Sequence, residues 1–194
     1  ALGAASTPMG GTQVAPVSAL ARLTASALCF TGIAVAAVYA LQARWVDVAV
    51  LLLVGLGQVL CLLAFRTAGA RATGSLILLV AGVSAAELLY ERILLWDLVI
   101  HLLATGVLTA LWRSLRGHGD PTERPRGREG GATASRVRVC AAVGLVLAVI
   151  WELMEAAGSV LVTPEIHNPP LDTVLDIGAG MIGAAMVGLR RRPL

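Results

Sequence analysis

The sequence contains no lysine, and only 14% of its 194 residues are charged. Hydrophobic residues make up 57% of the chain, and its mean hydropathy is +0.82. A soluble domain of this length carries more charge than that, so the composition excludes an ordinary soluble protein. The apolar runs also lack the alternation of apolar and polar residues that membrane β-strands show. These absences favour an all-α, polytopic membrane helix bundle.

Two further patterns indicate no binding site. Residues 178–183, GAGMIG, match the dinucleotide-binding motif G-x-G-x-x-G literally, but no strand precedes them and they lie in an apolar run. We interpret them as a helix-packing face and expect no nucleotide cofactor. The cysteines form no C-x-x-C pair, occur singly in apolar segments and are expected to be small buried residues. They are Cys29, Cys61 and Cys140.

Several apolar runs approach the roughly 20 residues that a helix needs to cross a bilayer. We expect about six transmembrane helices, at residues 23–41, 45–65, 73–90, 93–112, 137–157 and 173–189. The third and fourth alternatively join as a helical hairpin, because only Glu91 and Arg92 separate them. The helices form a single transmembrane domain, 23–189. Residues 1–22 are expected to be a flexible tail with no signal peptide to remove, and residues 190–194 a short second tail.

Arginine supplies all of the positive charge of the side chains, and its distribution predicts an orientation. If the N-terminus is cytoplasmic, the outer side holds only Arg44 and Arg92, whereas every other arginine lies on the inner side. This asymmetry is the positive-inside pattern, so we expect both termini and the Arg-rich loop 113–136 in the cytoplasm. The net charge of +3 therefore indicates topology and contact with membrane lipid, with no nucleic-acid partner.

Acidic residues gather at one depth when this orientation is applied to the expected helices. Four helices place ionisable side chains near their outer ends, and no acidic residue falls in the inner half of a helix. Chance placement would scatter these residues along the helices. The set consists of Glu87, Asp97, His101, Glu152, Glu155, Asp172 and Asp176.

The spacing within this set indicates which way the side chains point. Asp97 and His101 are four residues apart, and Glu152 and Glu155 are three apart, so the members of each pair lie on one face of a helix. Asp172 and Asp176 repeat the four-residue spacing. Small residues continue the same faces, and such residues let helices approach closely in lipid. We therefore expect the acids to point into the bundle.

Several carboxylates in a medium of low dielectric constant cannot all stay ionised without protons or a cation. Divalent metal ions are the simplest solution, and a set of Asp, Glu and one His suits Mg, Mn, Fe or Zn. Enough ligands exist for two ions. The pattern is similar to carboxylate-rich dimetal bundles, although the spacing of the His differs. A hydrogen-bonded structural network, most plausible around Asp97 and His101, is the alternative.

Other polar residues have simpler interpretations. We expect Asp47, Glu91 and Glu165 to mark the membrane interface, since none pairs with the cluster at helical spacing. His118 falls in the Arg-rich loop and is expected to be inert. His167 falls in the loop after the fifth helix, where a lid or a further ligand remains open.

Three segments of the second half resemble a known family. The segments WDLVIHLLATGVLTAL, WELMEAAG and LDTVLDIGAGMIGA, taken in this order and spacing, resemble the YjdF-like family of bacterial integral membrane proteins. The outline is more loosely similar to VanZ-like proteins. The resemblance covers residues 96–185 and implies a multi-pass protein of a bacterial plasma membrane. The resemblance places six residues of the set on motif positions of the family: Asp97, His101, Glu152, Glu155, Asp172 and Asp176. It implies little about activity.

Three classes of function remain open from the sequence. The first is a metal-dependent membrane enzyme that acts on a lipid or amphiphilic substrate near the outer leaflet. The second is a protein that binds or transports divalent cations, although few polar residues continue into the inner half: Gln58, Ser75 and Thr105. The third is a structural or partner-binding protein whose acids hold the bundle together. Substrate, metal identity and oligomeric state are open.

Overall fold

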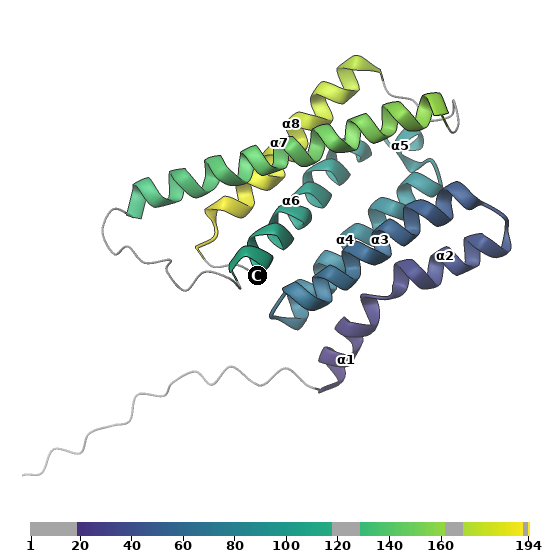
Figure 1. Cartoon of the computed structure of the whole chain (residues 1–194), viewed down its shortest axis with the longest axis horizontal. Coiled ribbons are helices and arrows are strands. Elements are labelled where there is room, and N and C mark those ends of the chain that lie inside the picture. The colour runs from purple at the N-terminus through teal and green to yellow at the C-terminus, as the bar shows by residue number, and fades with distance from the viewer. Residues whose placement is uncertain (1–18, 118–128, 162–168, 192–193) are drawn as a thin grey trace, which may run out of the picture.

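A computed structural model describes residues 19–117, 129–161, 169–191 and 194 as a set of helices without a β-strand (Figure 1). The all-α prediction is confirmed for these residues. The helices are α1 (Ala19–Leu28), α2 (Thr31–Leu41), α3 (Trp45–Ala64), α4 (Ala68–Ala86), α5 (Leu89–Arg92), α6 (Trp96–Gly117), α7 (Glu129–Leu161) and α8 (Pro170–Leu189). Helix α5 is a single turn, whereas the others are two or more turns long.

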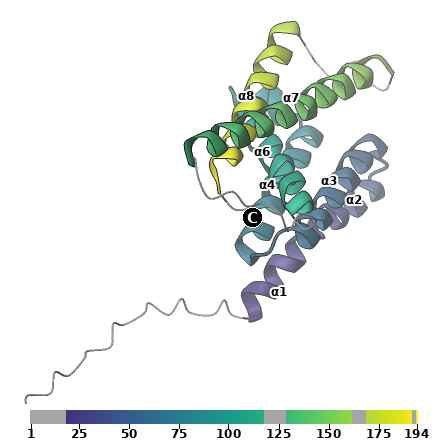
Figure 2. The ribbon, with the colours of Figure 1, turned by 60° about the vertical axis from the view of Figure 1, so that its left-hand side comes forward.

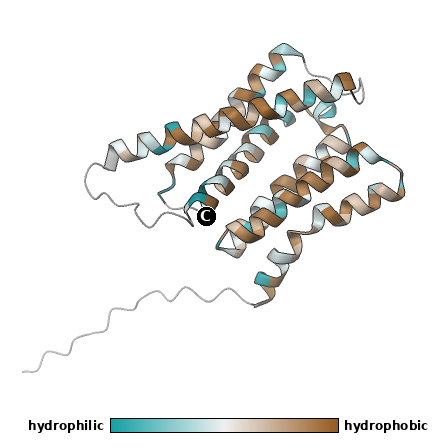
Figure 3. Cartoon of the chain, viewed as in Figure 1, coloured by the Kyte–Doolittle hydropathy of each residue, from teal (hydrophilic) through white to brown (hydrophobic). Residues whose placement is uncertain are grey.

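Among the described residues, five helices are long and apolar enough to cross a membrane, namely α3, α4, α6, α7 and α8. Helices α1 and α2 meet at an angle of 42° and together would supply a sixth span. Hydrophobic residues cover most of the long helices, and hydrophilic ones lie mainly near helix ends (Figure 3). Many large apolar side chains, including Leu63, Leu153 and Ile182, are exposed, as expected for surfaces that face lipid. The structure therefore supports a multi-pass membrane protein with five or six spans.

The first expected helix, 23–41, is interrupted after α1. The start of the second part, α2, is bound by the side chain of Gln58 in α3, which is fully buried. The Gln58 Oε1 accepts a hydrogen bond from the backbone N–H of Gly32, 2.7 Å away, in the first turn of α2. The Gln58 Nε2 donates to Thr31 Oγ1 and to the carbonyl oxygen of Ser75, each at 2.9 Å. We call Thr31, Gly32, Gln58 and Ser75 the Gln58 network. It supplies a partner for an N–H that a helix start leaves unsatisfied.

Other helix ends also differ from the expected bounds. Helix α4 begins at Ala68 because the Thr67 side chain accepts a hydrogen bond from the backbone N–H of Ala70. It ends at Ala86, and Leu88 adopts a left-handed conformation with φ of 52°, so α4 does not continue into α6. Helix α7 begins at Glu129, inside the expected loop. Residues 19–22 are helical rather than part of a tail, and residues 1–18, 118–128, 162–168 and 192–193 lie outside the described residues.

The molecule has two parts that meet along α6. Helices α1 to α4 pack together on one side, whereas α8 packs against both α6 and α7 on the other (Figures 1 and 2). A core of Phe65, Leu78, Val107 and Leu111 joins α3 and α4 to the C-terminal half of α6. This contact fixes the direction of α6 relative to the N-terminal helices.

Arginine side chains of the second part gather at one end of the bundle. The Arg113 Nη1 in α6 donates a hydrogen bond to the carbonyl oxygen of Val187 in α8, 2.7 Å away. At the same end, Gly188 of α8 lies against Val137 of α7. The opposite ends of α6, α7 and α8 carry the acidic residues. The arginine of α6 and the acids of this part thus lie at opposite ends, whereas in the first part Arg44 binds Asp47 and Glu87.

Candidate functional site

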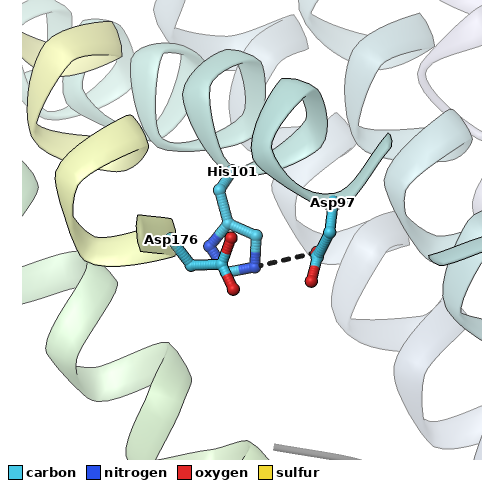
Figure 4. Close-up of side chains that lie close together, drawn as sticks. All are labelled: Asp97, His101 and Asp176. Atoms are coloured by element: carbon cyan, nitrogen blue, oxygen red, sulfur yellow. Dashed lines mark ion pairs between the residues drawn. The ribbon is translucent and has the colours of Figure 1, made fainter. Parts of the chain in front are cut away.

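Asp97 and His101 lie one turn apart on the first half of α6, as their spacing predicts. The His101 Nε2 lies 3.3 Å from the Asp97 Oδ1, and the imidazole is only 6% exposed (Figure 4). Asp97 lies in the first turn of α6, near backbone N–H groups whose partial positive charge favours a carboxylate. Helix α6 therefore presents an acid and an imidazole as one unit.

Helix α8 brings Asp176 to this pair, and its small residues make the close approach feasible. A Cβ atom at Gly183 would collide with the carbonyl oxygen of Leu102 in α6, and one at Gly144 of α7 would collide with Ala184. These contacts confirm that the small-residue faces pack. Asp176 is 2% exposed, and Figure 4 shows its carboxylate beside the His101 ring. Close helix packing thus places a carboxylate from α8 against the pair on α6.

Helix α7 contributes Glu152 and Glu155 from the other side of the imidazole. The Glu152 Oε1 lies 3.9 Å from the His101 Nδ1. The indole nitrogen of Trp151 donates a hydrogen bond of 2.8 Å to the Glu155 Oε1. The Trp151 ring also meets the His101 ring edge to face, with centroids 6.3 Å apart and an interplanar angle of 83°. Trp151 therefore positions both an acid and the imidazole.

The five residues Asp97, His101, Glu152, Glu155 and Asp176 form what we call the His101 cluster. It contains two groups of three residues. His101 forms one with Asp97 and Asp176 and the other with Glu152 and Glu155, and within each group the ligand atoms lie within 4.8 Å of one another. His101 belongs to both groups. Its Nε2 is directed toward an aspartate and its Nδ1 toward a glutamate. This donor set of carboxylates and one imidazole fits a hard or borderline divalent cation.

Asp176 shows most clearly that the cluster is incomplete. Among the described residues, its buried Oδ1 has no hydrogen-bond partner. No described arginine forms an ion pair with Asp97, His101 or Asp176. Because a buried carboxylate is costly unless it is paired, protonated or bound to a metal, Asp176 indicates a cation or proton that the described residues do not supply.

A cavity of about 550 Å³ opens beside the cluster. Three cluster residues, Asp97, Glu155 and Asp176, form part of its wall. The remaining lining residues are Val50, Ala85, Leu88, Tyr90, Glu91, Ile93, Leu94, Leu95, Leu98, Trp151, Met154, Asp172 and Leu175. Its volume is typical of a small-molecule site. We call it the acidic pocket.

The structure separates two expected site residues from the cluster. Asp172 lines the acidic pocket one turn before Asp176 but belongs to neither ligand group. Glu87 lies after α4 and takes part in a different contact, since its Oε1 accepts hydrogen bonds from the Tyr39 hydroxyl at 2.5 Å and from Arg44 at 3.0 Å. These hydrogen bonds, with that of Tyr39 the stronger influence, lower the pKa of the Glu87 carboxyl below its ordinary value.

The sequence interpretation missed three residues of the site. Tyr90 and Glu91 line the acidic pocket, although Glu91 was expected only to mark the interface. Trp151 precedes Glu152 and is four residues before Glu155, so its helical spacing was a usable signal.

Asp47, which we expect to mark the membrane interface, forms an ion pair of 2.6 Å with Arg44 outside the cluster. His118, Glu165 and His167 lie outside the described residues.

No family model, curated protein or solved structure matches the chain.

Proposed function

We propose that this protein is a metal-dependent integral membrane enzyme that acts on an amphiphilic substrate. One observation carries the proposal. Asp97, Glu155 and Asp176 belong to the ligand groups of the His101 cluster and also line the acidic pocket. A metal ion held by these residues would therefore lie at the wall of a cavity that is otherwise mostly apolar. A polar reacting group and an apolar tail have separate places in such a site.

The chemistry follows from the donor set. A divalent ion held by the residues of the His101 cluster would supply Lewis-acid chemistry and a more acidic bound water. A carboxylate of the pocket wall that does not bind metal would act as general base. Trp151 keeps the Glu155 carboxylate and the His101 ring in place. The leucines and Met154 of the wall exclude water from the apolar part of the substrate.

The location is part of the same proposal. The arginine distribution favours cytoplasmic termini and places the acidic pocket near the outer leaflet of a bacterial plasma membrane. The three motifs that carry Asp97, Glu152 and Asp176 support membership of the YjdF-like family. Cysteine labelling tests the orientation: Ser135→Cys should be protected from an impermeant outside reagent, and Ser159→Cys should react. The reverse pattern would place the pocket on the cytoplasmic side.

Metal content tests the central claim. We expect protein in lipid nanodiscs, incubated with Mn, Fe, Zn or Mg and then dialysed, to retain one or two divalent ions per chain by elemental analysis. Asp176→Asn and His101→Gln should lose them. Asp47→Asn is the matched control, because Asp47 is an acid bound to Arg44 outside the cluster. Absence of stoichiometric metal from the wild type, with all four metals, would contradict the proposal.

Cation transport is a second candidate that one observation favours. Helix α6 carries polar residues at every fourth position, and beyond Asp97 and His101 these are Thr105, Thr109 and Arg113. Thr105 and Thr109 are buried, and the Thr109 hydroxyl has no hydrogen-bond partner among the described residues. The close contact between Leu102 and Gly183 leaves little room for an ion beside this row. We therefore expect no uptake of manganese into proteoliposomes, whereas uptake lost in Asp176→Asn would favour transport.

A further inference from the structure

The acidic pocket has an unusual balance of charge. Five of its lining residues are carboxylates, and none of the described lining residues is arginine, lysine or histidine. The acids are Glu91, Asp97, Glu155, Asp172 and Asp176. Carboxylates that face one cavity repel each other, and the repulsion is stronger where water is partly excluded. A cation in the cavity relieves it.

Metal ions account for only part of this charge. Asp97, Glu155 and Asp176 belong to the metal ligand groups, whereas Glu91 and Asp172 belong to neither. Glu91 is exposed on α5, and Asp172 is partly exposed in the first turn of α8. Both therefore add carboxylates to the cavity wall that neither ligand group uses. An anionic head group placed there would meet these two carboxylates.

The rest of the wall suits an apolar group. Leucine, isoleucine, valine and methionine side chains make up about half of the lining, and Leu94 is 90% exposed on the outside of the bundle. The wall thus continues onto the surface that faces lipid, from which a tail can enter. Trp151 and Tyr90 add aromatic rings, whose faces attract cations.

From these observations we infer that the substrate of the acidic pocket is a cationic amphiphile, such as a lipophilic amine or quaternary ammonium compound. This inference rests on the proposed function, because only an enzyme has a substrate. The binding that it describes depends on the acidic pocket alone. The unpartnered and buried Oδ1 of Asp176 also favours positive charge at the same wall, whether a metal ion or the charged head supplies it. Glu91 and Asp172 are assigned the recognition of the charged head.

A matched pair of probes tests this inference. Tetraphenylphosphonium and tetraphenylborate share size and shape and differ in the sign of their charge. Each is titrated by equilibrium dialysis into metal-loaded protein in nanodiscs, with binding to empty nanodiscs subtracted. We expect saturable binding of the cation at least about tenfold tighter than that of the anion, as one or two partly screened charge pairs provide.

Variants connect the binding to the pocket. The double variant Glu91→Gln/Asp172→Asn should weaken cation binding by about tenfold while it retains metal, because neither residue belongs to a ligand group. Asp47→Asn should bind the cation like the wild type. Circular dichroism and metal content verify that the double variant is folded. If its cation affinity equals that of the wild type, the head group is recognised elsewhere and the inference is wrong.

The same experiment separates the two proposals. Preference for the anion by a protein that retains its metal would overturn the inference and leave the proposed metal function standing. Preference for the cation by a protein that holds no metal under any loading condition would support the inference and overturn the metal function. Loss of cation preference in the double variant, with metal retained, supports both.

Discussion

The Gln58 network and the His101 cluster are both buried polar sites between helices, but they differ in whether the described residues satisfy all of their polar atoms. Gln58 uses its carbonyl oxygen and both amide hydrogens, and all of its partners belong to the protein. In the His101 cluster, the Asp176 Oδ1 has no partner among the described residues. The first site carries no charge, whereas the second contains four carboxylates and one imidazole. A neutral site that is fully bonded joins α2, α3 and α4, and a charged site with an open position is suited to a ligand.

The largest effect that we expect concerns the helix contact that supports the His101 cluster. Gly183→Val should destabilise the protein by about 3 kcal/mol, the upper range for overpacking, because the added side chain meets the backbone of Leu102. It should also lose bound metal, since α8 carries Asp176. Thermal unfolding in detergent and elemental analysis measure both effects.

Gly178→Ala is the control for this substitution, because a Cβ at Gly178 has nothing within 4 Å. It should keep the stability and the metal content of the wild type. Equal behaviour of the two variants would mean that the contact between α6 and α8 does not support the cluster.

Metal removal should have the next largest effect on stability. It should change how variants of the His101 cluster behave, but not those of the Gln58 network. A ligand that binds only the folded protein at about 100 times its Kd contributes about 2.7 kcal/mol. Glu155→Gln and Asp97→Asn should therefore lower the melting temperature in metal-containing buffer, and most of this loss should disappear after chelation. Asp172→Asn should change the melting temperature less, because Asp172 lies outside the ligand groups.

If the cluster is only a structural network, the outcome is different. A neutral amide of the same shape in place of a buried charge is then often neutral or stabilising. A higher melting temperature for Glu155→Gln in both buffers would support that alternative.

Gln58→Leu should give an intermediate effect that does not depend on metal. The substitution leaves the Gly32 N–H without its side-chain partner and removes a second hydrogen bond to the Ser75 carbonyl, which costs about 1–3 kcal/mol. Chelation should change its melting temperature by the same amount as that of the wild type. An interaction between Gln58→Leu and chelation would show that the two polar sites are coupled across α6.

The smallest expected effect belongs to Glu87, which is partly exposed. Because hydrogen bonds from Tyr39 and Arg44 lower its pKa in the folded protein, Glu87 stabilises the fold above the ordinary carboxyl pKa. This contribution is lost as the pH falls through the lowered pKa. Glu87→Gln should remove that part of the acid dependence of the melting temperature and leave metal content unchanged. Loss of metal in this variant would mean that Glu87 belongs to the metal site, as the sequence predicts.

The periodicity of the sequence predicted the parts of the structure that depend on one helix at a time. The second expected helix, 45–65, matches α3 within one residue. The pairing of Asp97 with His101 follows from spacing alone, and the small residues of α8 pack as expected. Such features repeat with the helical turn, so a single sequence contains them.

The remaining features depend on contacts between distant helices. The break between α1 and α2 falls in a mostly apolar run without proline, and Gln58, far along the chain, binds the N–H of Gly32 just after it. Glu87 is at the expected level of the bundle but is bound by Tyr39 and Arg44, which no spacing rule connects to it. That His101 is shared between acids of α6, α7 and α8 is likewise a result of packing.

The order of the cluster residues along the chain has a consequence for biogenesis. Asp97 and His101 leave the ribosome first, Glu152 and Glu155 follow with α7, and Asp176 arrives with α8. At roughly 5–20 residues per second, several seconds separate the synthesis of Asp97 from that of Asp176. During this interval α6 enters the bilayer with an acid and an imidazole that have not yet met their partners. Insertion of α8 therefore completes the His101 cluster, so the metal binding that we propose would have to follow membrane integration of this helix.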